Sequence, residues 1–205
     1  MNRAAEVDQI VPGLFIWHAY DSAVKAELYS TGVLTAEACC VIDPIPIEPE
    51  ALAAAVPKRQ IRWVVVTNEN HLRATVRFAK DSGAAILAHS DLSDVEEIVG
   101  YTAVDRSEKI AGEITVISIE GAVRGEIALH SPANGGMLIV GDSLINFDPY
   151  GFTLLPSKYC SDQKRMRDSL RQLLDFKFER ILFAHGSPIV TRANERLDQL
   201  LSEQS

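Results

Sequence analysis

The chain has few cysteines and fewer basic than acidic residues. Its 205 residues include three Cys and no Cys-x-x-Cys pair, which excludes a disulfide framework and the common cysteine-based zinc motifs. Acidic residues outnumber basic ones by 28 to 20, and the formal net charge is −8. Nucleic acids and anionic membranes require a basic surface, so we expect neither as a partner. Cys39 and Cys40 lie in an apolar run and are predicted to be core residues.

Long apolar runs and phosphate-binding loops are absent as well. No stretch approaches the roughly 20 apolar residues that span a membrane, and the first residues lack the apolar segment of a secretory signal. Gly135-Gly136 lies between two strand patterns, whereas a glycine-rich phosphate loop opens a helix. The sequence therefore predicts a cytoplasmic protein without a membrane partner.

The apolar pattern predicts a mixed fold in a single domain spanning residues 1–205. Hydrophobic residues make up 47% and charged residues 23%, as in ordinary globular proteins. Runs rich in Val, Ile and Leu predict strands at 13–18, 27–31, 39–42, 63–66, 85–88, 114–118, 126–130, 137–140 and 180–183. Helical spacing predicts helices at 49–55, 72–82, 91–99, 162–176 and 194–202. Because strands dominate both halves, we expect an α/β (α+β) protein with two sheets packed face to face and helices outside.

Polar residues follow several of these strand patterns. Asp142 comes after the run 137–140, and His185 comes after the run 181–183, each at a turn. Side chains held at strand ends by a rigid sheet are a common way to build a metal site or an acid–base site. Asp142 and His185 are therefore the first candidate site residues. Asp43 also follows a strand and is predicted to have a structural role.

Six short motifs occur in an order that is informative as a set. They are Val11-Pro12-Gly13-Leu14-Phe15, Val41-Ile42-Asp43-Pro44, Val64-Val65-Val66-Thr67, Gly121-Ala122-Val123-Arg124-Gly125-Glu126, Gly141-Asp142-Ser143-Leu144 and His185-Gly186-Ser187-Pro188. Together they resemble the metallo-β-lactamase fold superfamily over nearly the whole chain. The last two resemble the strand end with the family's bridging Asp and its final G-H-G-x-P loop. The resemblance implies a four-layer αβ/βα sandwich of hydrolase ancestry.

The resemblance also implies a metal site, and here the sequence departs from the family. Active members hold two zinc ions with five His and two Asp, several of them in an H-x-H-x-D-H loop. Aligned without gaps after Thr67, the loop of this chain replaces four of these ligands, with Asn68, Asn70, Leu72 and Arg73 in turn. Ala122 stands where another His belongs. This register leaves Asp142 and His185 as the remaining ligands.

A second register is equally consistent with the sequence. If His71 is the last His of the family loop, the loop is two residues shorter and Asn70 takes the Asp position. His71, Asp142 and His185 then form the second metal site, with Asn70 as a weak neutral fourth ligand. One divalent ion (Zn, Fe or Mn) is expected in this case. A dinuclear zinc site is not expected, because Ala122 cannot coordinate a metal.

Each of these residues also has a structural interpretation. Asp142 can hydrogen-bond the adjoining loops, and His185 can pair with it without any metal. His71 can bond nearby backbone at the start of a helix. Arg73 can fill the vacant metal position with its own charge, pairing with Asp142 or Glu126. The sequence does not choose between these interpretations and a metal site.

Two functions follow from these alternatives. The first is a metal-dependent hydrolase of an ester, thioester, lactone or phosphoester, with His71, Asp142 and His185 as metal ligands and catalytic residues. The second is a metal-free pseudoenzyme that binds a small molecule or a partner protein in the old cleft. In that case the substrate-binding residues, in a pocket suited to a small anion, are Asn68, Asn70, Arg73, Arg124 and Glu126. The sequence does not decide whether the protein forms a homo-oligomer, and no apolar stripe indicates one.

Overall fold

The strands form two sheets that pack against each other. The computed structural model describes residues 2–56 and 60–203. The N-terminal sheet has its strands in chain order: β1 (Asp8–Val11), β2 (Leu14–Asp21), β3 (Ala26–Leu34), β4 (Cys39–Ile42), β5 (Ile61–Val65), β6 (Ala85–Ala88) and β7 (Thr102–Ala103). The C-terminal sheet has the order β14 (Arg180–Phe183), β11 (Met137–Val140), β10 (Ile127–Ser131), β9 (Ile114–Ser118) and β8 (Lys109–Ile110). A separate hairpin pairs β12 (Leu144–Phe147) with β13 (Gly151–Leu154).

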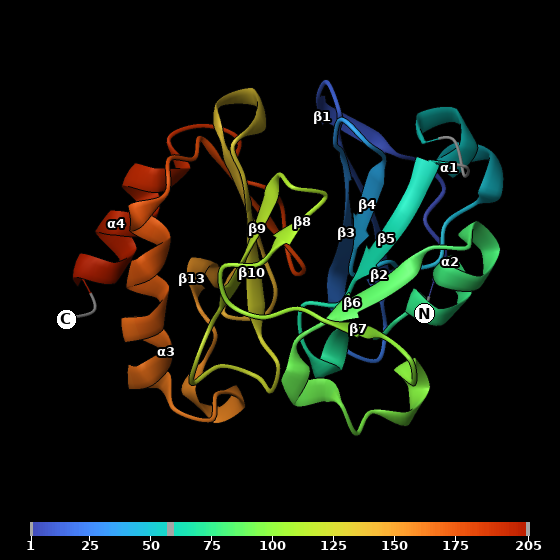
Figure 1. The fold of residues 1–205 in the computed structure, drawn as a ribbon. Coiled ribbons are helices and arrows are strands. Elements are labelled where there is room, and N and C mark those ends of the chain that lie inside the picture. Colours follow the sequence, from blue (N-terminus) through green and yellow to red (C-terminus); the bar gives the residue numbers. More distant parts are fainter. Residues whose placement is uncertain (1, 57–59, 204–205) are drawn as a thin grey trace.

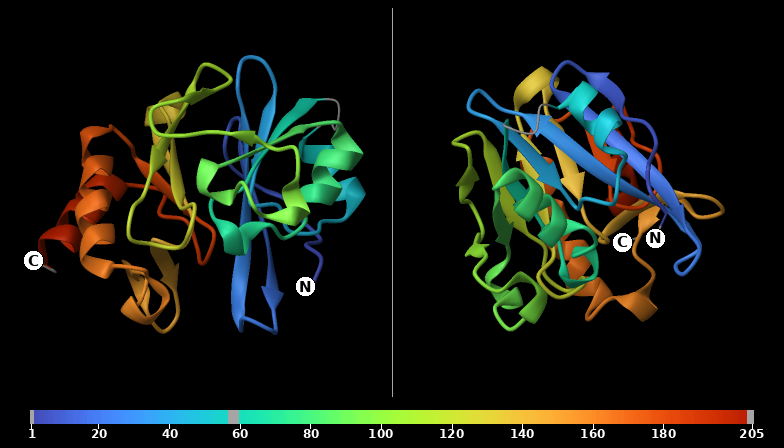
Figure 2. Two further views of the ribbon diagram at one scale, coloured as in Figure 1. Left: turned by 60° about the horizontal axis from the view of Figure 1, so that its bottom comes forward. Right: turned by 90° about the vertical axis from the view of Figure 1, so that its right-hand side faces the viewer.

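Helices cover the outer face of each sheet (Figure 1). Helices α1 (Pro49–Ala55) and α2 (Thr75–Ser82) lie on the N-terminal sheet, and α3 (Gln163–Leu170) and α4 (Ala193–Glu203) lie on the C-terminal sheet. The left view in Figure 2 shows the same separation of the two helix pairs. The four-layer αβ/βα sandwich expected from the sequence is confirmed. Among the described helices, none is both long and apolar enough to cross a membrane.

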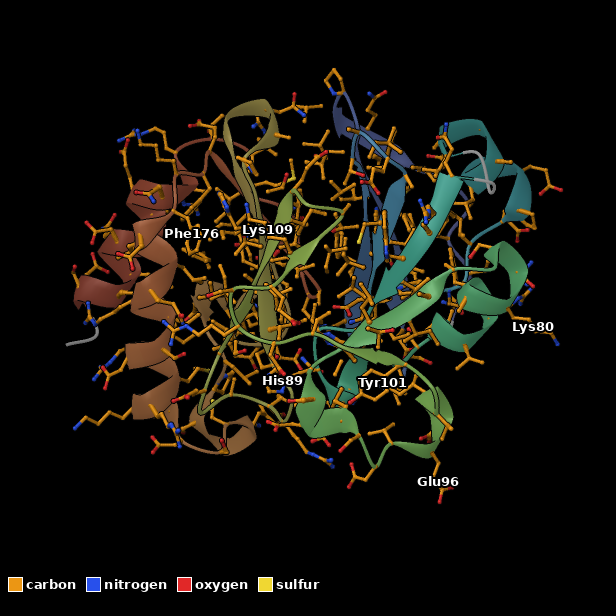
Figure 3. The ribbon with its side chains drawn as sticks, in the orientation of Figure 1. Lys80, His89, Glu96, Tyr101, Lys109 and Phe176 are labelled. Carbon is orange, nitrogen blue, oxygen red and sulfur yellow. The ribbon has the colours of Figure 1, made fainter. Side chains whose placement is uncertain are left out.

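Adjacent strand residues alternate between core layers. Cys40 packs between the sheets in one cluster with Ile139 of β11, whereas its neighbour Cys39 packs in the cluster that includes Leu52 of α1. In β11, Leu138 turns the other way and joins the cluster formed with α3 and α4. Side chains fill the space between the two sheets (Figure 3). The prediction that both cysteines are core residues is confirmed.

The strand predictions agree closely with the structure, and the helix predictions agree less well. Residues 91–99 do not form the predicted helix but contain two 3-10 turns, Ser90–Leu92 and Glu96–Ile98. The His89 side chain accepts a hydrogen bond from the Asp91 amide, and such local bonds compete with a continuing helix. Helix α2 begins at Thr75 rather than at residue 72, because Arg73 has a positive φ of 38° that no α-helix continues through. The strands β1, β7, β8, β12 and β13 were not predicted.

Candidate metal centre

Two parallel strand pairs bring distant loops together at one edge of the sandwich. Strands β11 and β14 are parallel neighbours with Val140 opposite Phe183, so Asp142 and His185 leave the sheet at equivalent positions. The His185 Nε2 atom lies 3.2 Å from Asp142 Oδ1. Strands β4 and β5 are also parallel neighbours, and they place Asp43 beside Thr67 in the same way.

His71 reaches this edge through a short 3-10 turn after β5. The turn, Glu69–His71, is capped by Asn68, whose side-chain oxygen accepts a hydrogen bond from the Asn70 amide at 2.9 Å. The buried His71 ring is held from behind: its Nδ1 lies 2.9 Å from Asp43 Oδ2 and 2.8 Å from Thr67 Oγ1. Its Nε2 atom therefore points forward, 3.1 Å from Asp142 Oδ1.

Three potential ligand atoms converge at this point. His71 Nε2, Asp142 Oδ1 and His185 Nε2 all lie within 4.8 Å of one another, with the two nitrogens 3.3 Å apart. Ligands bound to zinc at about 2.0–2.2 Å in tetrahedral geometry lie about 3.4 Å apart, close to these separations. Two imidazoles and one carboxylate are ligands that suit zinc, iron and manganese. The donor set therefore fits one divalent ion. Among residues 2–56 and 60–203 it is the one such group.

The charges around these atoms are strongly coupled. Burial and the Arg73 guanidinium disfavour protonated His71, but Asp142 and Asp43 outweigh them and raise its pKa to about 9. Burial acts to raise the pKa of Asp142, yet the His71 charge and hydrogen bonds from both histidines hold it well below its usual range. Burial lowers the pKa of His185. Without an ion, His71 thus carries a proton that a metal has to displace.

Two of the three candidate ligands, Asp142 and His185, line an open cleft of about 610 Å³, and the buried His71 does not. Asn70, Asp142 and His185 line one part of it. The remaining walls come from Val123, the turn between β2 and β3, the β12–β13 hairpin and the segment at residues 155–159. Its volume is in the range of small-molecule binding sites.

Comparison with known proteins shows the family to which the chain belongs. The sequence model described as the metallo-β-lactamase superfamily matches residues 8–203. The chain belongs to the metallo-β-lactamase superfamily.

Solved structures of metallo-β-lactamases share the fold over almost the whole chain. DIM-1 metallo-β-lactamase has a TM-score of 0.74 and 14% identity, over 100% of this chain and 99% of that one. A metallo-β-lactamase from Erythrobacter litoralis has a TM-score of 0.72 and 19% identity, over 96% of each chain. A flavoprotein from Thermotoga maritima has a TM-score of 0.74 and 14% identity, over 98% of this chain and 61% of that one. No curated protein sequence matches this chain. At these identities, the structural likeness is one of fold.

The position of His71 distinguishes the two registers of the superfamily loop. His71 faces Asp142 and His185, as the register with the shortened loop requires. Asn68 and Asn70 instead direct their amide groups at the other carboxylate oxygen, with Nδ2 atoms 3.3 Å and 3.2 Å from Asp142 Oδ2. Asp142 therefore turns one oxygen to the histidines and the other to two neutral amides.

Glu126 lies behind Asn68 as a second buried carboxylate. Its Oε2 accepts a hydrogen bond from Asn68 Nδ2 at 2.6 Å, and its Oε1 accepts one from the Ser143 amide at 2.8 Å. Burial and the nearby charge of Asp142 raise the pKa of Glu126 to about 7, against these two bonds. Glu126 thus titrates near neutral pH.

This shift predicts a pH-dependent stability for metal-free protein. The folded pKa of Glu126, about 7, lies above its ordinary value of 4.5, so this contribution to stability is fully present below about pH 4.5 and is lost as the pH rises towards 7. Glu126→Gln should reduce the fall in unfolding free energy between about pH 5 and 8, by on the order of 3 kcal/mol. Urea unfolding of chelator-treated protein measures it. The exposed Glu120→Gln is the control, and equal pH dependence in both variants would contradict the prediction.

The two arginines predicted to bind substrate have other partners. The Arg73 guanidinium donates to the carbonyl oxygens of Tyr29 and Asp43 and lies 3.5 Å from His185 Nε2. Arg73 therefore lies beside the ligand atoms but donates to main-chain carbonyl oxygens. The predicted ion pair of Arg73 with Asp142 or Glu126 is not formed. Arg124 forms ion pairs with Asp94 and Glu69.

Arg124 and Glu126 line a neighbouring cavity of about 500 Å³ and not the cleft beside His185. Val123 borders both cavities. The roles of Asn68, Asn70, Arg73, Arg124 and Glu126 in substrate binding stay predictions, and only Asn70 of these five lines the cleft.

Sequence reasoning did not find the residues that orient His71. The sequence predicts a structural role for Asp43, and in the structure its carboxylate lies against His71 Nδ1. Metal-binding imidazoles are commonly oriented by a carboxylate on their other nitrogen. The signal was present, because Asp43 and Thr67 end two strand patterns in the way that Asp142 and His185 do.

Proposed function

We propose that this protein is a hydrolase that uses one divalent metal ion. The observation that carries the proposal is the convergence of His71 Nε2, Asp142 Oδ1 and His185 Nε2 beside a cleft of substrate size. Membership of the metallo-β-lactamase superfamily supports a hydrolytic reaction. The substrate classes compatible with this chemistry are esters, thioesters, lactones and phosphoesters.

In this proposal His71, Asp142 and His185 hold the ion. A bound divalent ion supplies a water of lowered pKa and polarises the substrate carbonyl or phosphoryl oxygen. Asp43 keeps the His71 ring oriented and favours a proton on Nδ1, so that Nε2 is free to bind. Asn70 holds the second oxygen of Asp142 and so fixes the carboxylate plane.

The contacts of Asp142 support one ion rather than two. The amide groups of Asn68 and Asn70 bond the carboxylate oxygen that faces away from His71 and His185. Because the Asn68 oxygen caps the 3-10 turn, its amide nitrogen is committed to the two carboxylates. These N–H donors occupy the side of Asp142 Oδ2 where a second metal ion would bind. An N–H group has no lone pair to offer a metal, so the two amides provide no ligand for a second ion.

One observation favours the alternative, a metal-free binding protein. Both oxygens of Asp142 already have hydrogen-bonding partners, and the Arg73 cation lies beside His185. A permanent charge at that distance opposes a divalent ion. In this alternative, the cleft binds a small molecule without hydrolysing it.

Metal titration distinguishes the two functions. We expect chelator-treated protein to bind close to one equivalent of Zn²⁺, Mn²⁺ or Fe²⁺ in calorimetry, with release of the His71 proton. Elemental analysis of protein purified without a His-tag should agree. Binding of no ion would favour the metal-free alternative, and binding of two would contradict the role given to Asn68 and Asn70.

A further inference from the structure

Most of the residues that line the cleft beside His185 are apolar or aromatic, and this bears on the substrate. Building on the proposed hydrolase function, we propose that the substrate is a neutral carboxylic ester, thioester or lactone with an apolar acyl group. The geometry sets this group against the β12–β13 hairpin and the β2–β3 turn while the carbonyl lies at Asp142 and His185.

Exposed apolar side chains gather at the mouth of this cleft. Val24, Tyr150 and Tyr159 come from three separate segments and are 57%, 60% and 58% exposed, yet all three line the same cleft. Single exposed apolar residues are ordinary, but a group of them around a cavity marks a binding surface. Ile145 and Leu155 continue the apolar lining inwards.

The aromatic wall is fixed relative to His185. The Phe147 ring lies 6.5 Å from the His185 ring and 5.5 Å from that of Tyr150, in edge contact with the latter. Main-chain bonds join Asn146 to the His185 loop, and its side chain donates to the Ser187 carbonyl at 2.7 Å. An apolar group on this wall is therefore held at a constant distance from the candidate catalytic residues, which favours binding by preorganisation.

The charges in the cleft argue against a phosphoester. The charged side chains that line it include Lys25 as the cation, against the acids Asp142 and Asp148. Phosphate recognition relies on several Arg or Lys donors or on oriented amides. Arg73 and Arg124 are bound elsewhere and do not line the cleft.

The reaction with such a substrate is a hydrolysis. The oxygen of water bonds to the carbonyl carbon, and the bond from that carbon to the alcohol oxygen or thiol sulfur breaks. One water proton ends on the leaving oxygen or sulfur, and the other is released from the acid product. The apolar acyl group changes only how well the substrate binds and is oriented.

Three nitrophenyl substrates test the proposal. For metal-loaded protein, kcat/KM should be at least about 10-fold higher for para-nitrophenyl hexanoate than for the acetate, because each buried methylene contributes about fourfold. Para-nitrophenyl phosphate should be the poorest substrate. Tyr150→Ser should lower the hexanoate to acetate ratio by about threefold or more, and Val24→Ser should lower it as well. The matched control is Val99→Ser, which alters a side chain that is 84% exposed and outside the cleft. A ratio near one, or a preference for phosphate, would overturn the proposal.

Binding of a ketone separates this proposal from the hydrolase function. We expect 2-decanone, which is neutral and cannot be hydrolysed, to bind chelator-treated protein in calorimetry more tightly than phenyl phosphate. Tyr150→Ser should weaken this binding, and Val99→Ser should not. If the ketone binds in this way but no ester is hydrolysed, the apolar site stands and the hydrolase function fails. If esters are hydrolysed without dependence on chain length and the ketone does not bind, the hydrolase function stands and the apolar site fails.

Discussion

Asp142→Asn is expected to weaken metal binding by at least about 100-fold and to lower any hydrolytic activity by at least as much. Asp142 contributes the single carboxylate among the three ligand atoms, and an amide in its place lacks the negative charge that attracts the ion. Loss of groups that merely orient a ligand already costs 10–100-fold in metal affinity, so loss of a ligand should cost more. Competition with a chromophoric chelator measures the affinity.

The control for this substitution is Asp81→Asn, which removes an exposed carboxylate from α2. It changes the net charge equally but should leave metal affinity as in the wild type. If Asp142→Asn binds metal as tightly as Asp81→Asn, the ion is held elsewhere and the proposed site is wrong.

Gly186→Ala is expected to destabilise the protein by about 3 kcal/mol or more and to disrupt the metal centre. Gly186 has a φ of +100°, which L residues rarely adopt, and a Cβ atom there would lie 2.0 Å from the Asn146 carbonyl oxygen. Overpacking alone costs about 1–3 kcal/mol, and the positive φ adds about 1–2 kcal/mol. To relieve the clash, the His185 loop has to move away from β12, and His185 would leave its place beside Asp142.

Gly100→Ala is the matched control for that substitution. Gly100 has a similar φ of +85°, but a Cβ atom there would meet nothing within 4 Å. It should lose about 1–2 kcal/mol from the backbone term and retain metal binding. Urea unfolding measures the stability of both variants, and metal titration measures their metal affinity. Equal stability loss, or full metal affinity in Gly186→Ala, would contradict the contact with Asn146.

Much of the fold was predictable because the apolar pattern reports local burial. The runs at 39–42 and 137–140 are fully buried strands, and each supplies residues to two core layers, which is why they read as unbroken apolar stretches. The helix predicted at 91–99 was wrong because Ser and Asp side chains and the His89 cap favour short turns there. The β12–β13 hairpin was missed because its strands are four residues long and belong to neither of the two larger sheets.

The sequence by itself determined the superfamily, the layered architecture and the candidate residues Asp142 and His185. The ends of the strands and the order of the motifs can both be recognised along the sequence without knowledge of tertiary contacts. Only the tertiary structure decided the register of the loop, since that depends on which side chain after Thr67 reaches Asp142. It placed His71 there by pairing β4 with β5, so that Asp43 holds the ring from behind. The apolar cleft likewise joins the β2–β3 turn to residues 145–159, which lie far from it in the sequence. No local pattern records such a contact, because it arises from packing between elements rather than from the propensities within them.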